Sequence, residues 1–211
     1  MAQSLYVDQD TYHTMTLTGQ GHVMAAPDVA VIRLGVQSTG TDLAQIQNEN
    51  AQISQDIIQS LMQSGNTDIK TIEYTVDKSY EYDNGKQIDK GYSVRHILEI
   101  RTDQINEVGT IVDALVKAGS NVVSSISFEL SDPNYYYQQA LNLAVDNAIQ
   151  KAKSISANFH LRLNSVPVKI MEGNISPIPI VRFQREAAAT PILAGELKIE
   201  AFVTTDFLYT D

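Results

Sequence analysis

The chain has 211 residues, 43% of them hydrophobic and 19% charged, which suits one large or two small globular domains and excludes wholesale disorder. Its 15 basic and 25 acidic residues give a net charge of −10, which opposes binding to nucleic acid or to an anionic membrane surface. The lack of cysteine excludes disulfides, thiolate nucleophiles and cysteine metal sites.

The first residues, 1–14, contain neither a basic segment nor an apolar run, so no signal peptide is visible. No stretch approaches the ~18 apolar residues of a membrane span. We therefore expect a cytoplasmic protein from the sequence as given, and a periplasmic or cell-envelope protein if a leader was removed.

Two strands are predicted first, Thr14–Val23 and Val29–Ser38, paired as an antiparallel hairpin through a Pro-Asp turn. Gly19 and Gly21 resemble the start of a dinucleotide-binding loop, but that loop needs a third glycine and a helix after it. Here a methionine stands at the third position and a strand follows. The two glycines instead predict a bulge, or a face against which another backbone or side chain packs closely.

A helix is predicted next, with Thr41 as its N-cap and its end near Ser64, before a Gly-Asn stop. Asn50 falls on the apolar stripe of this helix and must find hydrogen-bond partners there. We expect it to fasten the helix to a neighbouring turn, with a ligand role as the alternative. The apolar residues at helical spacing are Leu43, Ile46, Ile53, Ile57 and Leu61.

A second hairpin follows, Ile72–Tyr82 with Ile88–Arg101, and its tip has turn chemistry. It carries four tyrosines. Aromatic residues on paired strands stabilise the pair, but tyrosine is also favoured in protein interfaces, and both interpretations stay open. The interface candidates on this hairpin are Tyr74, Tyr80, Tyr82 and Tyr92.

The chain then predicts a helix over Gln104–Ala118, a strand over Val122–Leu130 and a long helix over Pro133–His160. A Ser-Asp cap with proline at the first helical position marks the start of the long helix. Alanines on its inward face let another layer approach closely. We expect this face to comprise Tyr137, Leu141, Ala144, Ala148, Ala152, Ile155 and Phe159.

A strand over Val166–Met171 leads into the proline-rich segment Asn174–Ala194, which is either a functional loop or a simple crossover. Arg182 and Arg185 in this segment are further interface candidates, because they are cations on an acidic protein. The last strand, Glu196–Tyr209, alternates apolar and polar residues and is expected to close the sheet begun by the first hairpin.

The order of elements predicts an α+β fold with two lobes, in which antiparallel sheets are each covered by helices. The N-terminal lobe is expected to hold residues 1–82 and 174–211, with the first hairpin, the first helix and the C-terminal strand that completes it. Residues 83–173 are expected to form an inserted α+β lobe that holds the other two helices.

Catalytic motifs are missing from the sequence. The four histidines, His13, His22, His96 and His160, lack metal-ligand spacing, and His96 shares a strand face with apolar residues, as a core or edge histidine does. Neither a nucleophile elbow nor a phosphate-binding loop occurs. The sequence does not exclude a pair of carboxylates brought together by folding, but no motif proposes one. We expect no cofactor, no bound metal and no enzyme activity.

Short motifs recur in a fixed order along Thr14–Tyr209. The first are Thr18-Gly19-Gln20-Gly21, Ala26-Pro27-Asp28-Val29-Ala30, Leu34-Gly35-Val36 and Glu49-Asn50. The later ones are Asp68-Ile69-Lys70-Thr71 with Tyr80, Gly91-Tyr92, Val108-Gly109 with Asp113, Ala118-Gly119-Ser120-Asn121, Ile126-Ser127-Phe128, the alanine-rich run Ala140–Ala152 and Pro191–Gly195. In this order and spacing they resemble the SIMPL-domain family.

The resemblance implies a bacterial envelope, periplasmic or cytoplasmic protein, related to members linked with oxidative-stress defence and to members that assemble into rings. It supplies no catalytic residue. We therefore expect a non-enzymatic, self-associating homo-oligomer that acts as a scaffold or a stress-related interaction protein, with any other protein partner unknown. The alternative is an enzyme or small-ligand binder with its site between the lobes.

We predict that the protein, purified without chelator, contains no stoichiometric transition metal, because no histidine has a ligand-like neighbour in the sequence. Elemental analysis checks this expectation. One zinc or iron per chain, bound through the histidines, would contradict it.

Overall fold

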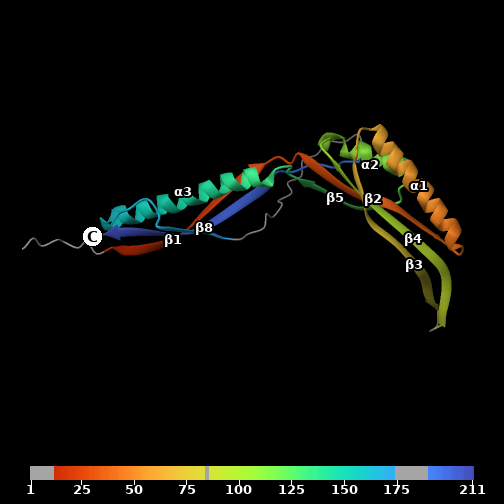
Figure 1. Cartoon of the computed structure of the whole chain (residues 1–211), viewed down its shortest axis with the longest axis horizontal. Coiled ribbons are helices and arrows are strands. Elements are labelled where there is room, and N and C mark those ends of the chain that lie inside the picture. The colour runs from red at the N-terminus through yellow and green to blue at the C-terminus, as the bar shows by residue number, and fades with distance from the viewer. Residues whose placement is uncertain (1–11, 84–85, 174–189) are drawn as a thin grey trace, which may run out of the picture. The chain divides into compact units, whose positions relative to one another are not determined.

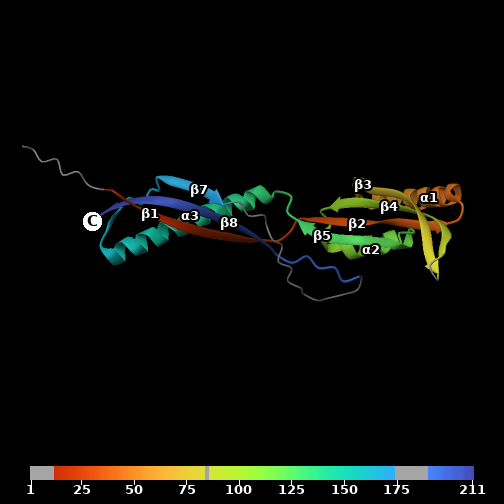
Figure 2. The same cartoon turned by 90° about the horizontal axis from the view of Figure 1, so that it is seen from below.

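The computed structural model describes residues 12–83, 86–173 and 190–211. The chain forms two compact units (Figures 1 and 2). Unit 1 comprises Met1–Ala25, Asp132–Ile180 and Glu196–Asp211, and unit 2 comprises Ala26–Ser131 and Val181–Gly195. Each unit has an antiparallel sheet with helical cover on one face, so the predicted α+β class is confirmed.

Unit 1 is built around its last strand, β8 (Leu197–Thr210). On one side β8 pairs with β1 (His13–Ala25), from His13 opposite Tyr209 to Ala25 opposite Leu197. On the other side it pairs with β6 (Arg162–Leu163) and β7 (Lys169–Gly173). The last strand was predicted to close the sheet begun by the first hairpin, and this is confirmed for the first strand of that hairpin, β1.

Helix α3 (Pro133–Phe159) covers this sheet and lies along β1 and β8 (Figure 1). Its N-cap Asp132 accepts a hydrogen bond from the Tyr135 backbone N–H at 3.1 Å, as predicted from the Asp-Pro start. The small residues that it buries recur every four positions and so share one helical face. They are Ala140, Ala144, Ala148, Ala152 and Ser156.

The glycines of β1 face this small-residue stripe. A Cβ atom added to Gly19 would overlap the backbone carbonyl of Ala144, and one added to Gly21 would overlap that of Ala140. Helix and strand therefore approach backbone to backbone, which side chains larger than alanine would prevent. The predicted close approach at the two glycines is confirmed.

Helix α3 also covers the free edge of β1. Its Asn147 Oδ1 accepts from the Gln20 backbone N–H at 3.2 Å, and its Lys151 Nζ donates to the Thr18 carbonyl at 2.8 Å. Both backbone groups would otherwise be available to a further strand. These contacts therefore hinder the addition of another strand at the middle of this edge.

Unit 2 holds a four-stranded sheet in the order β3-β4-β2-β5, all antiparallel. The strands are β2 (Val29–Gly40), β3 (Asp68–Asp83), β4 (Lys86–Thr102) and β5 (Val122–Glu129). Helices α1 (Leu43–Gln63) and α2 (Val108–Lys117) cover one face, with a short 3-10 helix at Ile105–Glu107 before α2. Their apolar stripes meet the buried residues of β2 and β4 in one core, which includes Ile32, Leu34, Ile57, Leu61, Leu98, Ile100, Ile111 and Leu115.

The predicted hairpin of Thr14–Val23 with Val29–Ser38 is wrong, because β1 and β2 belong to different sheets. Both edges of β2 are occupied by β4 and β5, which leaves none for β1. The connecting segment is held to β5 instead. The Asp28 backbone N–H donates to the Glu129 carbonyl at 3.1 Å, and the Asp28 carboxylate accepts from the N–H and hydroxyl of Ser131 at 2.6 and 2.5 Å.

The units divide the chain differently from the expected lobes of residues 1–82 with 174–211 and 83–173. Helix α1 was expected in the N-terminal lobe but packs on β2 and β4 in unit 2. Helix α3 was expected in the inserted lobe but packs on β1 and β8 in unit 1.

Two details of the helices also differ from the prediction. Asp42 rather than Thr41 caps α1, accepting from Gln45 N–H at 3.2 Å, and Phe159, expected inside, is 71% exposed.

We predict that Gly21→Ala lowers the free energy of unfolding by about 2 kcal/mol, because the added methyl group overlaps the helix backbone and the core must shift. Urea denaturation measures the change. Gly173→Ala is the matched control, since its Cβ would meet Phe202 at 3.4 Å and beyond, and it should change stability by less than about 0.5 kcal/mol. Equal effects of the two substitutions would contradict the close-packing argument.

Candidate functional site

Strands β3 and β4 continue beyond the end of β2 and carry the tyrosines (Figure 1). Strand β2 ends at Gly40, opposite Tyr92, so past this point β3 and β4 pair only with each other in the described part of the chain. Side chains two residues apart on a strand share a face. Tyr74, Val76, Lys78 and Tyr80 therefore share one face of β3, and Tyr92 joins them because it lies opposite Lys78.

We call this set the tyrosine face: Tyr74, Val76, Lys78, Tyr80 and Tyr92. Tyr74 is 53% exposed and Tyr80 is 46% exposed, which is unusual for large side chains on a strand that a helix could cover. The structure thus brings together three of the four tyrosines that the sequence proposed. Tyr82 pairs its backbone with Gln87, but its side chain lies outside the described residues. Arg182 and Arg185 lie outside them entirely.

Lys78 organises the tyrosine face. Its ammonium group lies 5.5 Å from the centroid of the Tyr80 ring and 5.8 Å from that of Tyr92, within the range of cation–π attraction. It also forms an ion pair of 2.7 Å with Asp89, and this hydrogen bond raises the pKa of Lys78 and lowers that of Asp89. The pair leaves the face nearly neutral and places the Lys78 ammonium group beside two of its rings.

A bulge sets the direction of this hairpin. Ser79 lies opposite Gly91 and Tyr80 opposite Asp89, so Lys90 is an extra residue in β4. Gly91 has a φ of +89°, and a Cβ atom there would overlap the Gly40 backbone. The Asp89 carboxylate accepts from the Gly91 N–H at 2.8 Å and holds the bulge. The Asp-x-Gly triplet was the available sequence signal, and the sequence analysis missed it.

His96 lies beside the tyrosine face and links two hydroxyl groups. Its Nδ1 is 2.9 Å from Ser54 Oγ, its Nε2 is 2.9 Å from Thr71 Oγ1, and the Tyr74 ring meets it edge-on at 5.5 Å between centroids. Burial lowers the pKa of His96. A neutral imidazole donates to one hydroxyl and accepts from the other, which is the arrangement of a structural histidine.

Asn50 fastens α1 to two strands rather than to a turn. Its side-chain Nδ2 donates to the carbonyls of Val36 at 3.2 Å and Val94 at 3.1 Å. Its Oδ1 is buried without a hydrogen-bond partner among the described groups. Because the Nδ2 group bonds to two strand carbonyls, the structural role predicted from the sequence accounts for the donor side of this amide.

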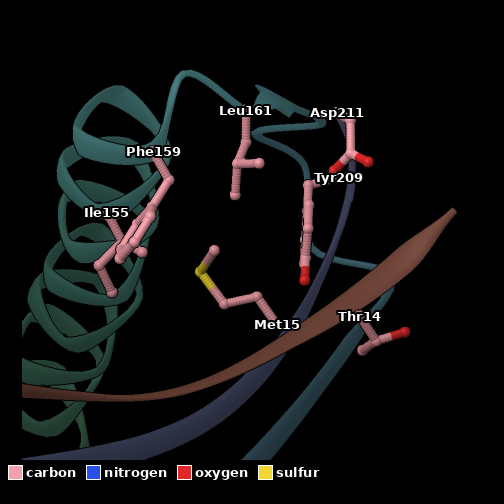
Figure 3. Close-up of a pocket in the computed structure, with 7 residues that line it drawn as sticks. All are labelled: Thr14, Met15, Ile155, Phe159, Leu161, Tyr209 and Asp211. Carbon is pink, nitrogen blue, oxygen red and sulfur yellow. The ribbon is translucent and has the colours of Figure 1, made fainter.

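A separate groove of about 430 Å³ lies in unit 1 (Figure 3). Phe159 and Tyr209 stand on opposite sides of it, with Leu161 and Met15 between them. The sequence did not point to this groove, because Phe159 was expected to pack inward. The lining residues are Thr14, Met15, Ile155, Phe159, Leu161, Tyr209 and Asp211.

Within residues 12–83, 86–173 and 190–211, no group of three or more histidine, aspartate or glutamate side chains is placed to hold a metal ion. Among the helices of these ranges, none is long and apolar enough to cross a membrane.

Comparison with known proteins gives one family. The model of the SIMPL family, a protein of unknown function (DUF541), matches residues 15–207. The chain is 30% identical over 200 residues to the uncharacterized protein YggE of Escherichia coli K12, covering 93% of this chain and 80% of that protein. It is 27% identical over 209 residues to the 26 kDa periplasmic immunogenic protein of Brucella melitensis biotype 1, covering 92% and 83%.

We predict that lowering the pH from 8 to 5.5 reduces the stability of the wild-type protein partly through His96. Because burial lowers its folded-state pKa, the unfolded state binds the proton more readily. The contribution is fully present above about pH 6.5 and is lost as the pH falls through the native pKa.

Urea denaturation across this pH range checks the prediction. His96→Gln, which can still donate and accept between the hydroxyls, should flatten the pH dependence of stability. An unchanged slope in His96→Gln would show that His96 titrates alike in both states.

Proposed function

This chain belongs to the SIMPL family, and we propose that it is a non-enzymatic interaction protein that self-associates through the tyrosine face. The observation that carries the proposal is the exposure of Tyr74, Val76 and Tyr80 along one side of a single strand. Contiguous exposed apolar side chains on a soluble protein mark contact sites more often than chance exposure does.

The chemistry of this face suits a protein contact. Tyrosine buries a large apolar ring while its hydroxyl can still find a polar partner. Lys78 is already paired with Asp89 and lies against the Tyr80 and Tyr92 rings. A partner that covered the face would therefore bury a neutralised pair rather than an isolated charge, which lowers the desolvation cost.

A second copy of the chain is the occupant that we favour. Lys78 on this face is neutralised by its ion pair with Asp89, so the face carries no net excess of either charge and is self-compatible. Arg182 and Arg185 remain proposed contacts on the acidic chain, whose net charge of −10 would make association depend on salt.

We also propose a location and a mode of action for this chain. The Brucella relative is named periplasmic, and we propose a periplasmic or cell-envelope location for this chain in place of the cytoplasmic one. A stress-related role would use binding rather than thiol redox chemistry, because the chain has no cysteine.

An enzyme or small-ligand binder is the second candidate. The groove of unit 1 favours it, because its volume of about 430 Å³ falls within the range of small-molecule sites. Among the described residues it lacks convergent titratable groups, Asp211 being the charged residue in its lining. This composition suits binding better than catalysis.

We predict that Tyr74→Ser with Tyr80→Ser shifts the protein toward the monomer mass of 23.3 kDa in light scattering. Loss of two aromatic anchors should weaken association at least about 10-fold. Tyr135→Ser is the matched control, since Tyr135 is 59% exposed on α3 in unit 1 and should leave the mass unchanged.

Light scattering of the wild-type protein at low and high salt completes the test. A monomer at every concentration would refute self-association. An oligomer that survives the double substitution would keep the assembly and discard the tyrosine face, and one that survives Arg182→Glu would discard that contact.

A further inference from the structure

The groove of unit 1 is formed by the way α3 ends. His160 adopts the left-handed conformation with a φ of 60°, and the Leu161 N–H donates to the Ser156 carbonyl at 2.9 Å. This C-cap reverses the chain direction. Strand β6 then starts at Arg162 and pairs with the end of β8, where Leu163 lies opposite Tyr209. Leu161 is thereby fixed over the space between the helix end and the sheet.

Two aromatic rings form opposite walls of this space (Figure 3). Phe159 comes from the last turn of α3 and Tyr209 from β8, while Met15 and Ile155 line the apolar interior. The His13 ring packs against Tyr209, at 5.5 Å between ring centroids. Phe159 is 71% exposed, although an aromatic ring next to an apolar interior gains stability when it is covered.

The charge at the groove is negative. Of the lining residues, Asp211 is the charged one, and its carboxylate lies beside the Tyr209 wall, while Thr14 adds a hydroxyl. Two aromatic walls with a carboxylate at the rim attract a cation through the ring faces and through direct ion pairing. An anionic ligand is disfavoured here, and the net charge of −10 opposes it further.

We propose that this groove binds a small organic cation, an ammonium group carried on an aromatic or alkyl body. The body lies among Met15, Ile155 and Leu161, and the ammonium group lies at the rim, between the aromatic walls and the Asp211 carboxylate. The proposal is independent of self-association, because the lining residues all belong to unit 1 whereas the tyrosine face belongs to unit 2.

The experiment compares three probes of one size on the full chain. They are 2-phenylethylammonium, the neutral 2-phenylethanol and the anionic phenylacetate. Methyl resonances of Met15, Ile155 and Leu161 report binding by NMR.

The cation should give saturable shifts of these methyl groups and bind at least about 5-fold more tightly than the alcohol, with the anion weakest. Asp211→Asn should weaken binding of the cation about 3- to 10-fold and leave the alcohol unchanged. The matched control is Asp146→Asn, an exposed carboxylate of α3 outside the groove lining, which should change neither.

Phe159→Leu keeps an apolar side chain at an exposed position, so the fold should persist. This substitution should weaken binding of the cation more than binding of the alcohol. Equal affinity for cation and alcohol would overturn the proposal in favour of a plain apolar groove. Shifts that do not saturate, or that Asp146→Asn reduces as much as Asp211→Asn does, would also overturn it.

Discussion

The backbone contact between α3 and β1 is the constraint on which unit 1 depends. With glycine at positions 19 and 21, the strand lies directly against the carbonyls of Ala140 and Ala144. A single helix on a narrow sheet buries little apolar side-chain area. The unit is instead stabilised by the close approach of the two backbones, which makes many short-range dispersion contacts. The same closeness lets Asn147 and Lys151 reach over the edge of β1 and occupy its backbone groups.

Unit 2 is stabilised by large buried side chains, in contrast to unit 1. Its sheet has two helices and a conventional core of branched side chains, and this core includes Ile32, Leu98 and Leu115. The surplus length of β3 and β4 lies beyond that core and must be stabilised locally. The Gly91 bulge and the Lys78–Asp89 pair do so with contacts inside the hairpin. These contacts lie within the hairpin and do not cover its aromatic side chains. The Tyr74 and Tyr80 rings therefore stay about half exposed.

Local elements were predictable from the sequence, whereas their assignment to sheets was not. Capping and periodicity located α1 and α3, turn residues located the β3–β4 hairpin, and the paired glycines indicated either a bulge or a close contact with another backbone or side chain. The hairpin of the first two strands failed because sequence proximity favours pairing, and here both edges of β2 are taken by β4 and β5. Phe159 failed for a similar reason. Helical spacing puts it near the apolar stripe, but the buried residues of that helix face end at Ser156, and Phe159 in the last turn is 71% exposed.

The two long outer strands explain why a face rather than an edge is the proposed contact. Free edges invite further strands unless they are blocked. The middle of β1 is blocked by two side chains of α3, and β3 carries an extra residue, Ile72, at a register shift. Bulges disturb the regular spacing that a docking strand would need. A contact through side chains escapes this restriction, and the exposed aromatic rings of unit 2 lie on a strand whose edge is irregular. Edge protection and an open aromatic face are therefore compatible features of the same hairpin, and they favour association with a defined geometry over open-ended strand addition.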